Sequence, residues 1–173
     1  MFKQFTLIVI FISGAFSYAQ LNEAVKQENV IAAYIYNFTK FLEWPKNDSN
    51  YFYISIIGES KIIKPLNMIA EKEKINGKEI VIDEINDISN LKPNSMLYLS
   101  PGEEYKLQAI LRKTSNMNIL TISNSDGFAR KGVCINFSVV NNKLKFEINR
   151  KAIEEAGIVP NTRLLSLAVK IYE

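Results

Sequence analysis

The chain contains no histidine and only one cysteine, Cys134, among its 173 residues. Histidine is the commonest general base and metal ligand, so its absence excludes a Ser-His-Asp triad and a Cys-His pair. A zinc site is excluded as well, because a single cysteine cannot supply its ligands. No intramolecular disulfide is possible, so packing alone must stabilise the fold. Two interpretations of Cys134 stay open: a small buried hydrophobe, or one half of an intermolecular disulfide.

Neither sign of charge is in large excess, because the chain has 21 basic and 18 acidic residues and a formal net charge of +3. No cluster of Lys and Arg is interleaved with aromatic residues, which argues against nucleic acid as a partner. Neither a G-x-G-x-x-G run nor a P-loop occurs in the sequence. The chain therefore carries no nucleotide signature, and no cofactor is predicted.

Long hydrophobic runs are also scarce, and the prominent one lies at the N-terminus. Lys3 precedes the apolar residues 5–16, and Ser17-Tyr18-Ala19 has small residues at the positions that a signal peptidase reads. This pattern predicts a cleaved signal peptide over residues 1–19, and no cysteine follows that could carry a lipid anchor. Residues 20–173 are then expected to be exported and soluble, and to form one domain, because they contain no repeat and no Pro/Gly linker.

Hydrophobic periodicity and turn signals divide residues 20–173 into helices and strands. Helices are predicted over residues 22–42, 61–74, 101–113, 150–156 and 161–171, and strands over residues 51–57, 79–85, 96–99, 118–123, 133–140 and 144–148. Ser100 is expected to cap the third helix, with Glu103 completing a capping box. The alternation favours an α/β fold in three layers, with a mixed, mostly parallel sheet and helices on both faces. A C-terminal antiparallel hairpin is expected at one edge.

Acidic neighbours are the only candidates for acid–base catalysis. They occur as Asp83-Glu84, Glu103-Glu104 and Glu154-Glu155. Hydrolysis needs two carboxylates that converge across a cleft, whereas neighbours in sequence point apart on a helix or strand. No catalytic residue and no enzyme activity are therefore predicted, and an exported hydrolase is the least favoured hypothesis.

Aromatic residues are concentrated in the first predicted helix. Tyr34, Phe38 and Phe41 recur at helical spacing, Tyr36 lies between them, and Trp44 follows the helix. Such a stripe is usually core. Here the helix is apolar over more than one face, which leaves surplus hydrophobic surface for a partner. We predict Tyr34, Tyr36, Phe41 and Trp44 as partner-binding residues.

A second group of candidates lies in predicted loops. Ligands of open α/β sheets bind at the carboxyl ends of strands, where the loops around Ser60, Ser100 and Asp126 are expected. Arg163 adds a guanidinium group that suits carboxylate or phosphate ligands. Ser60, Asp126 and Arg163 are therefore predicted ligand-binding residues, although a plain βα turn with a serine cap is the commoner explanation of Ser60.

Both ends of the mature chain resemble the YfiR family of exported bacterial proteins. Residues 33–45 contain an Asn-Phe-x-x-Phe-x-x-Trp-Pro run that is similar to the family's opening helix. The segments that resemble the family's C-terminal part are residues 132–137, 144–149 and 163–168. The resemblance implies a periplasmic α/β signalling protein without enzyme activity.

The resemblance also implies partners. Relatives repress an inner-membrane diguanylate cyclase by binding its periplasmic part, and an outer-membrane lipoprotein can sequester the repressor. Other relatives serve membrane sensor kinases, and the family includes homodimers and binders of small ligands. Some relatives have paired cysteines, whereas Cys134 stands alone here. The leading hypothesis is a regulator of a cyclase or kinase, and the alternative is a periplasmic module that binds a nucleotide or an amino acid.

Overall fold

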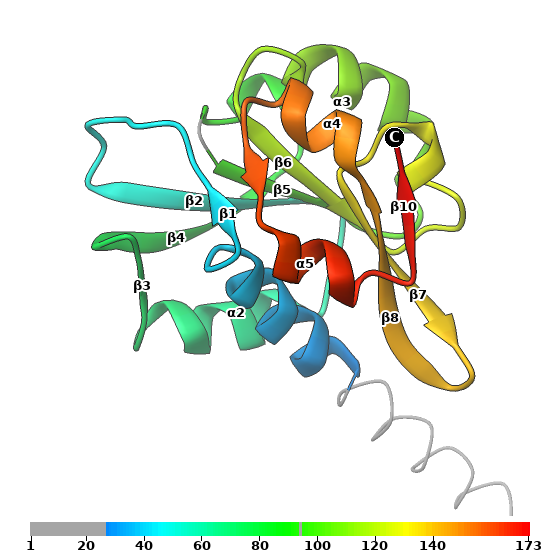
Figure 1. The fold of residues 1–173 in the computed structure, drawn as a ribbon. Helices are drawn as coiled ribbons and strands as arrows, with labels where there is room; N and C mark the ends of the chain where they lie inside the picture. The colour runs from blue at the N-terminus through cyan, green and yellow to red at the C-terminus, as the bar shows by residue number, and fades with distance from the viewer. Residues whose placement is uncertain (1–26, 94) are drawn as a thin grey trace, which may run out of the picture.

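The computed structural model describes residues 27–93 and 95–173 (Figure 1). The predicted signal peptide of residues 1–19 lies outside the described residues. Eight strands form one sheet in the order β10-β8-β7-β6-β5-β2-β4-β3. Their bounds are β2 (Tyr51–Ile57), β3 (Lys74–Ile75), β4 (Lys78–Ile85), β5 (Ser95–Leu99), β6 (Ile119–Ser123), β7 (Ile135–Val140), β8 (Lys143–Asn149) and β10 (Lys170–Tyr172).

Five helices pack around this sheet within the described part of the chain. They are a first helix over residues 27–38, then α2 (Ile63–Ala70), α3 (Leu107–Thr114), α4 (Arg150–Glu155) and α5 (Thr162–Leu167). The predicted mixed, mostly parallel sheet is confirmed, because only the β3–β4 and β7–β8 pairs of the described sheet are antiparallel. The sequence did not predict the curvature of this sheet, which strand twist curls into a half-barrel (Figure 1).

The central strands are buried on both faces. Every residue of β5 is buried, and its side chains alternate between two core clusters. Met96 and Tyr98 join the cluster that contains the first helix and α2, whereas Leu97 and Leu99 join the cluster that contains α3. Because successive strand residues point to opposite faces, these helices cover opposite faces of the sheet.

The first helix ends at residue 38, so the prediction that it runs to Leu42 is wrong. Thr39 Oγ1 donates to the carbonyl oxygen of Tyr36 at 2.6 Å, which competes with the helical backbone pattern. Three residues later the chain enters β1 (Leu42–Glu43), which pairs with β9 (Val159–Pro160) in a separate two-stranded ladder. This long-range pairing favours an extended backbone.

The predicted helix start at Ser100 is also wrong. Gly102 has a φ of 92°, a left-handed conformation that a right-handed helix cannot continue through. Ser100 is fully buried and bonds to the neighbouring strand, since its backbone N–H donates to the carbonyl of Ile57 at 3.1 Å. A 3-10 turn (Glu104–Lys106) therefore precedes α3.

The C-terminal segment departs from the predicted long helix. Helix α5 ends at Leu167, and Ile171 lies in β10, which pairs in parallel with β8. The β7–β8 hairpin is therefore covered by a further strand instead of lying at the edge. The hairpin itself is confirmed. Asn141 and Asn142 both have left-handed φ values, 51° and 58°, which are typical of a two-residue type I′ turn.

Helix α2 is shorter than predicted, because Lys74 pairs with Glu79 in the β3–β4 hairpin rather than extending the helix. Asparagine side chains cap the N-termini of α4 and α5. Asn149 Oδ1 accepts from the N–H of Ala152 at 2.8 Å, and Asn161 Oδ1 accepts from the N–H of Leu164 at 2.9 Å.

Phe38 joins the first helix to the β7–β8 hairpin, and its replacement should be costly. Its ring lies 5.1 Å from that of Phe146 and 5.8 Å from that of Phe137, measured between centroids. Phe38→Ala should lower the free energy of unfolding by about 3–5 kcal/mol, because it leaves a cavity in a packed core. Urea denaturation measures this loss.

The matched control is Tyr105→Ala, because the Tyr105 side chain is 76% exposed. This change should alter the free energy of unfolding by no more than about 0.5 kcal/mol. A similar loss in both variants would contradict the assignment of Phe38 to the core.

Candidate functional site

The strand order reverses between β2 and β5. The chain leaves β2 through α2 to reach β4 on one side, and it leaves β5 through α3 to reach β6 on the other side. Because α2 and α3 belong to different core clusters, the two connections depart over opposite faces of the sheet. In open α/β sheets the crevice at such a point, outside the carboxyl ends of the strands, is where ligands bind.

A hollow of about 300 Å³ lies at this crevice. It is lined by the first helix and by the loops after β2, β5 and β6, including Glu28, Ser60, Lys61, Tyr98 and Asn124. We call it the switch-point pocket. An adjoining hollow of about 490 Å³ shares Asn124 and contains Asp126. The structure therefore brings the predicted residues Ser60 and Asp126 to the same edge of the sheet.

Tyr98 is the most deeply buried polar side chain of the switch-point pocket. It is 2% exposed, and its hydroxyl donates to Asn124 Oδ1 at 2.8 Å. Burial raises the pKa of Tyr98 well above its ordinary value, and the nearby charge of Glu28 adds to this effect. The phenol therefore stays protonated and serves as a hydrogen-bonding group. Ser60 Oγ accepts from the N–H of Ile62 at 3.4 Å.

Two glutamates near the adjoining hollow, Glu103 and Glu104, are held ionised. Glu103 forms an ion pair with Lys106 at 2.6 Å, and this contact holds the pKa of Glu103 below its ordinary value. Hydrogen bonds from the backbone N–H groups of Glu104 and Gly102, and then from Ser125, lower the pKa of Glu104. A carboxylate with a lowered pKa is a poor general acid at neutral pH. The arrangement suits binding rather than hydrolysis.

Two of the predicted partner-binding residues pack against the core. Tyr34 is half-buried, and its ring centroid lies 5.8–5.9 Å from those of Phe38, Phe137 and Phe146. Trp44 packs edge-on against Phe52 with a centroid separation of 4.9 Å. Both side chains therefore contribute to packing beneath the first helix and the segment that follows it.

Tyr36 and Phe41 flank the end of the first helix, which lies between α2 and α5 (Figure 1). The hydroxyl of Tyr36 donates to Glu73 Oε2 at 2.7 Å, and this hydrogen bond raises the pKa of Tyr36. The ammonium group of Lys40 lies 4.4 Å from the centre of the same ring. Both rings are only half-buried, so they are accessible at the surface.

Arg163 lies apart from the other two predicted ligand residues. It stands on α5, and its guanidinium carbon lies 5.6 Å from the ring centre of Phe41. No pocket that contains Ser60 or Asp126 in the described structure includes it. No sequence pattern predicts this cation–π contact, because its two residues are far apart along the chain.

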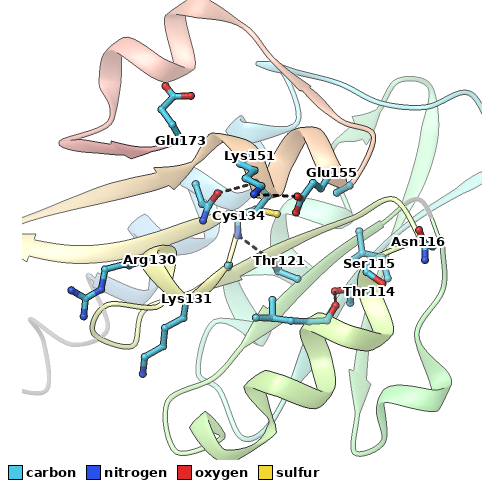
Figure 2. A pocket seen from close by; sticks show the side chains of 16 residues that line it. Thr114, Ser115, Asn116, Thr121, Arg130, Lys131, Cys134, Lys151, Glu155 and Glu173 are labelled. Atoms are coloured by element: carbon cyan, nitrogen blue, oxygen red, sulfur yellow. Dashed lines mark hydrogen bonds and ion pairs between the residues drawn. The ribbon is translucent and has the colours of Figure 1, made fainter.

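A larger hollow of about 680 Å³ lies between α3 and α4 (Figure 2). Cys134 lines it, and the backbone N–H of Cys134 donates to Thr121 Oγ1 at 3.0 Å. Burial raises the pKa of the Cys134 thiol, so the thiol stays protonated and unreactive. Figure 2 shows the side chains of Arg130 and Lys131 pointing away from Cys134, so these two cations do not approach the thiol.

The described residues contain no group of three or more His, Cys, Asp or Glu side chains that could hold a metal ion.

Residues 28–169 match the YfiR/HmsC-like family. The chain belongs to the YfiR/HmsC-like family. YfiR/HmsC-like proteins are known as periplasmic repressors of diguanylate cyclases, and the family is regulatory rather than catalytic. A search of curated proteins finds no match. No helix within residues 27–93 and 95–173 is long and apolar enough to span a membrane.

The buried thiol leads to a prediction about pH. The unfolded chain loses the Cys134 proton near the ordinary thiol pKa of about 8.5, whereas the folded chain retains it because burial raises the pKa. The contribution of Cys134 to the free energy of unfolding is therefore complete below about pH 8.5 and declines as the pH rises above it. Cys134→Ala should remove the part of the decline in unfolding free energy that ionisation of this thiol causes. Urea denaturation between about pH 8 and pH 9.5 measures the difference.

A thiol reagent provides the independent readout. It should modify the native protein slowly and the urea-unfolded protein at once. Rapid, complete modification of the native protein would show that Cys134 is accessible, and an intermolecular disulfide would then become the better interpretation.

Proposed function

We propose that this protein is a periplasmic regulator that binds and controls an inner-membrane signalling enzyme, a diguanylate cyclase or a sensor kinase. Membership of the YfiR/HmsC-like family is the observation that carries the proposal. The chemistry of the described residues supports it, because the carboxylates Glu103 and Glu104 are held ionised and the thiol of Cys134 is protonated. A regulator of this kind needs a surface that recognises a partner, and it needs no reactive group.

We assign partner recognition to the aromatic residues at the end of the first helix. Tyr36 and Phe41 are the accessible members, and Tyr34 and Trp44 hold the segment in place from below. Tyrosine and arginine side chains are enriched among residues that dominate binding energy at protein interfaces. Tyr36, and Arg163 over Phe41, fit that pattern. An outer-membrane lipoprotein or a second copy of the chain would compete for the same rings.

Phe41→Asp should abolish control of the membrane enzyme, because it removes the ring that a partner would contact and puts in its place a carboxylate that must lose its water, even beside Arg163. The measurement is in-cell crosslinking of a tagged chain with mass spectrometry of the captured proteins, together with the output of the captured cyclase or kinase. Tyr36→Asp should act in the same direction.

Tyr105→Asp serves as the control, since it introduces the same charge at a side chain that is 76% exposed elsewhere on the molecule. It should leave capture and control intact. Folded Phe41→Asp protein that still captures and controls the enzyme would exclude this surface. Capture of no signalling enzyme by the unchanged chain would exclude the regulatory function itself.

A second candidate function, a module that binds a nucleotide or an amino acid, is favoured by the switch-point pocket. Its position at the reversal of strand order is where α/β sheets bind ligands. It offers carboxylates from Glu28 and Glu59, an ammonium group from Lys61 and a hydroxyl from Ser60. Asp126 lies in the adjoining hollow. Such mixed charges suit a small ligand that carries both signs.

Thermal unfolding with a panel of nucleotides and amino acids tests this candidate. A ligand at about one hundred times its Kd should raise Tm by about 5–10 °C, because it binds only the folded chain. Lys61→Gln combined with Ser60→Ala should remove the rise, whereas Ser166→Ala, at an exposed position on α5, should preserve it. The absence of any rise across the panel at millimolar concentrations would count against the binding module.

A further inference from the structure

One corner of the molecule collects exposed aliphatic side chains. Val139 and Val140 at the end of β7 are 60% and 40% exposed. Leu167 and Val169, at the link between α5 and β10, are 53% and 45% exposed, and Ile171 in β10 is 38% exposed. These five make up half of the large hydrophobic side chains that are exposed in the described part of the chain. A concentration of this kind marks an interaction surface rather than ordinary scatter.

The sheet topology brings the two segments together, because β8 lies between β7 and β10. Val139 is the register partner of Leu144 in β8, and the backbone N–H of Val169 donates to the carbonyl of Phe146 at 3.0 Å. Both contacts fall within the same three residues of β8. Figure 1 shows the hairpin projecting beyond the body of the protein beside the α5–β10 link.

Most charges around this corner are positive. Residues 137–146 and 167–172 contain no Asp or Glu, whereas they contain Lys143, Lys145 and Lys170. The nearest acidic residue along β8 is Glu147, and its Oε2 accepts from the Tyr172 hydroxyl at 3.5 Å. An apolar surface bordered by lysines is complementary to an anionic, partly apolar partner.

The shape of the hairpin distinguishes between partners of this chemistry. Successive strand residues point to opposite faces, so Val139 and Val140 project from both sides of the tip. A folded protein surface that covers one side leaves the other valine in water, whereas a fluid lipid surface surrounds both. Pairing of the β10 edge with a second copy is disfavoured, because β10 has only three residues and Lys170 is one of them.

We propose that the hairpin tip of residues 139–143, together with Leu167 and Val169, docks on an anionic lipid membrane. The aliphatic side chains enter the boundary between headgroups and acyl chains, and the lysines lie at the headgroup phosphates. The docking is reversible, because two short loops of aliphatic side chains bury far less apolar area than a membrane-spanning helix. This inference goes beyond the proposed function, since it requires no protein partner.

Vesicle co-sedimentation tests the proposal. The protein used begins at Gln20, because the apolar run of residues 5–16 would itself bind lipid. It should sediment with vesicles of phosphatidylglycerol and phosphatidylethanolamine, more weakly with pure phosphatidylcholine vesicles, and less in high salt. Lys143→Gln and Lys145→Gln should each weaken binding about fivefold. Val139→Asp with Val140→Asp should weaken it about tenfold or more.

The matched controls are Val159→Asp and Lys113→Gln. Val159 is 54% exposed in β9, and Lys113 is exposed near the end of α3. The controls therefore repeat the Val→Asp and Lys→Gln replacements at exposed positions away from the corner. Vesicle binding should be unchanged in both, and thermal unfolding checks that every variant is folded. Failure of the unchanged protein to bind anionic vesicles overturns the proposal, as does equal weakening by the control changes. Loss of self-association in the valine variant without any vesicle binding would identify a protein interface instead.

Discussion

The parallel pairing of β2 with β5 is the constraint on which the other features of this fold depend. Both strands lie in the middle of the sheet, and β5 is buried along its whole length. Strands that are buried on both faces need helices over each face, so the chain leaves the two strands in opposite directions. A crevice then opens at their carboxyl ends, with Tyr98 beneath it. Ser100 holds the edge of this crevice through its backbone hydrogen bond to Ile57.

The ionisable groups near the hollows are held in states that favour binding over bond-breaking chemistry. Glu103 and Glu104 are kept ionised by an ion pair and by backbone N–H groups, respectively. Tyr98 and Cys134 are kept protonated by burial. A catalytic acid or base needs a pKa near the working pH, and these four groups are all shifted away from it. The regulatory character of the YfiR/HmsC-like family agrees with this electrostatic arrangement.

Two surfaces of different physical character serve different kinds of partner. Tyr36 is oriented by Glu73 and Lys40, and Phe41 lies under Arg163. Rings that are held in place lose little entropy on binding, so this region suits a protein partner of defined shape. The aliphatic corner around Val139 has no such fixed polar frame. It suits a partner that adapts to both faces of a hairpin.

The sequence by itself determined the elements whose signals are local. The strand at Tyr51–Ile57 and the antiparallel β7–β8 hairpin agree with prediction, because the residues that form them are neighbours in the chain. The lone cysteine was also open to prediction as a buried hydrophobe, since it alternates with Val133 and Ile135.

Only the tertiary structure decided the features that depend on distant segments. The first helix ends early because Leu42 pairs with Pro160, and Ser100 caps no helix because it bonds to β2. Ile171 forms a strand because β8 offers it unpaired backbone groups. The contacts of Arg163 with Phe41 and of Tyr98 with Asn124 likewise join residues with no shared local pattern. Local propensities differ by less free energy than such long-range hydrogen bonds and packing supply, so the tertiary contacts prevail where the two disagree.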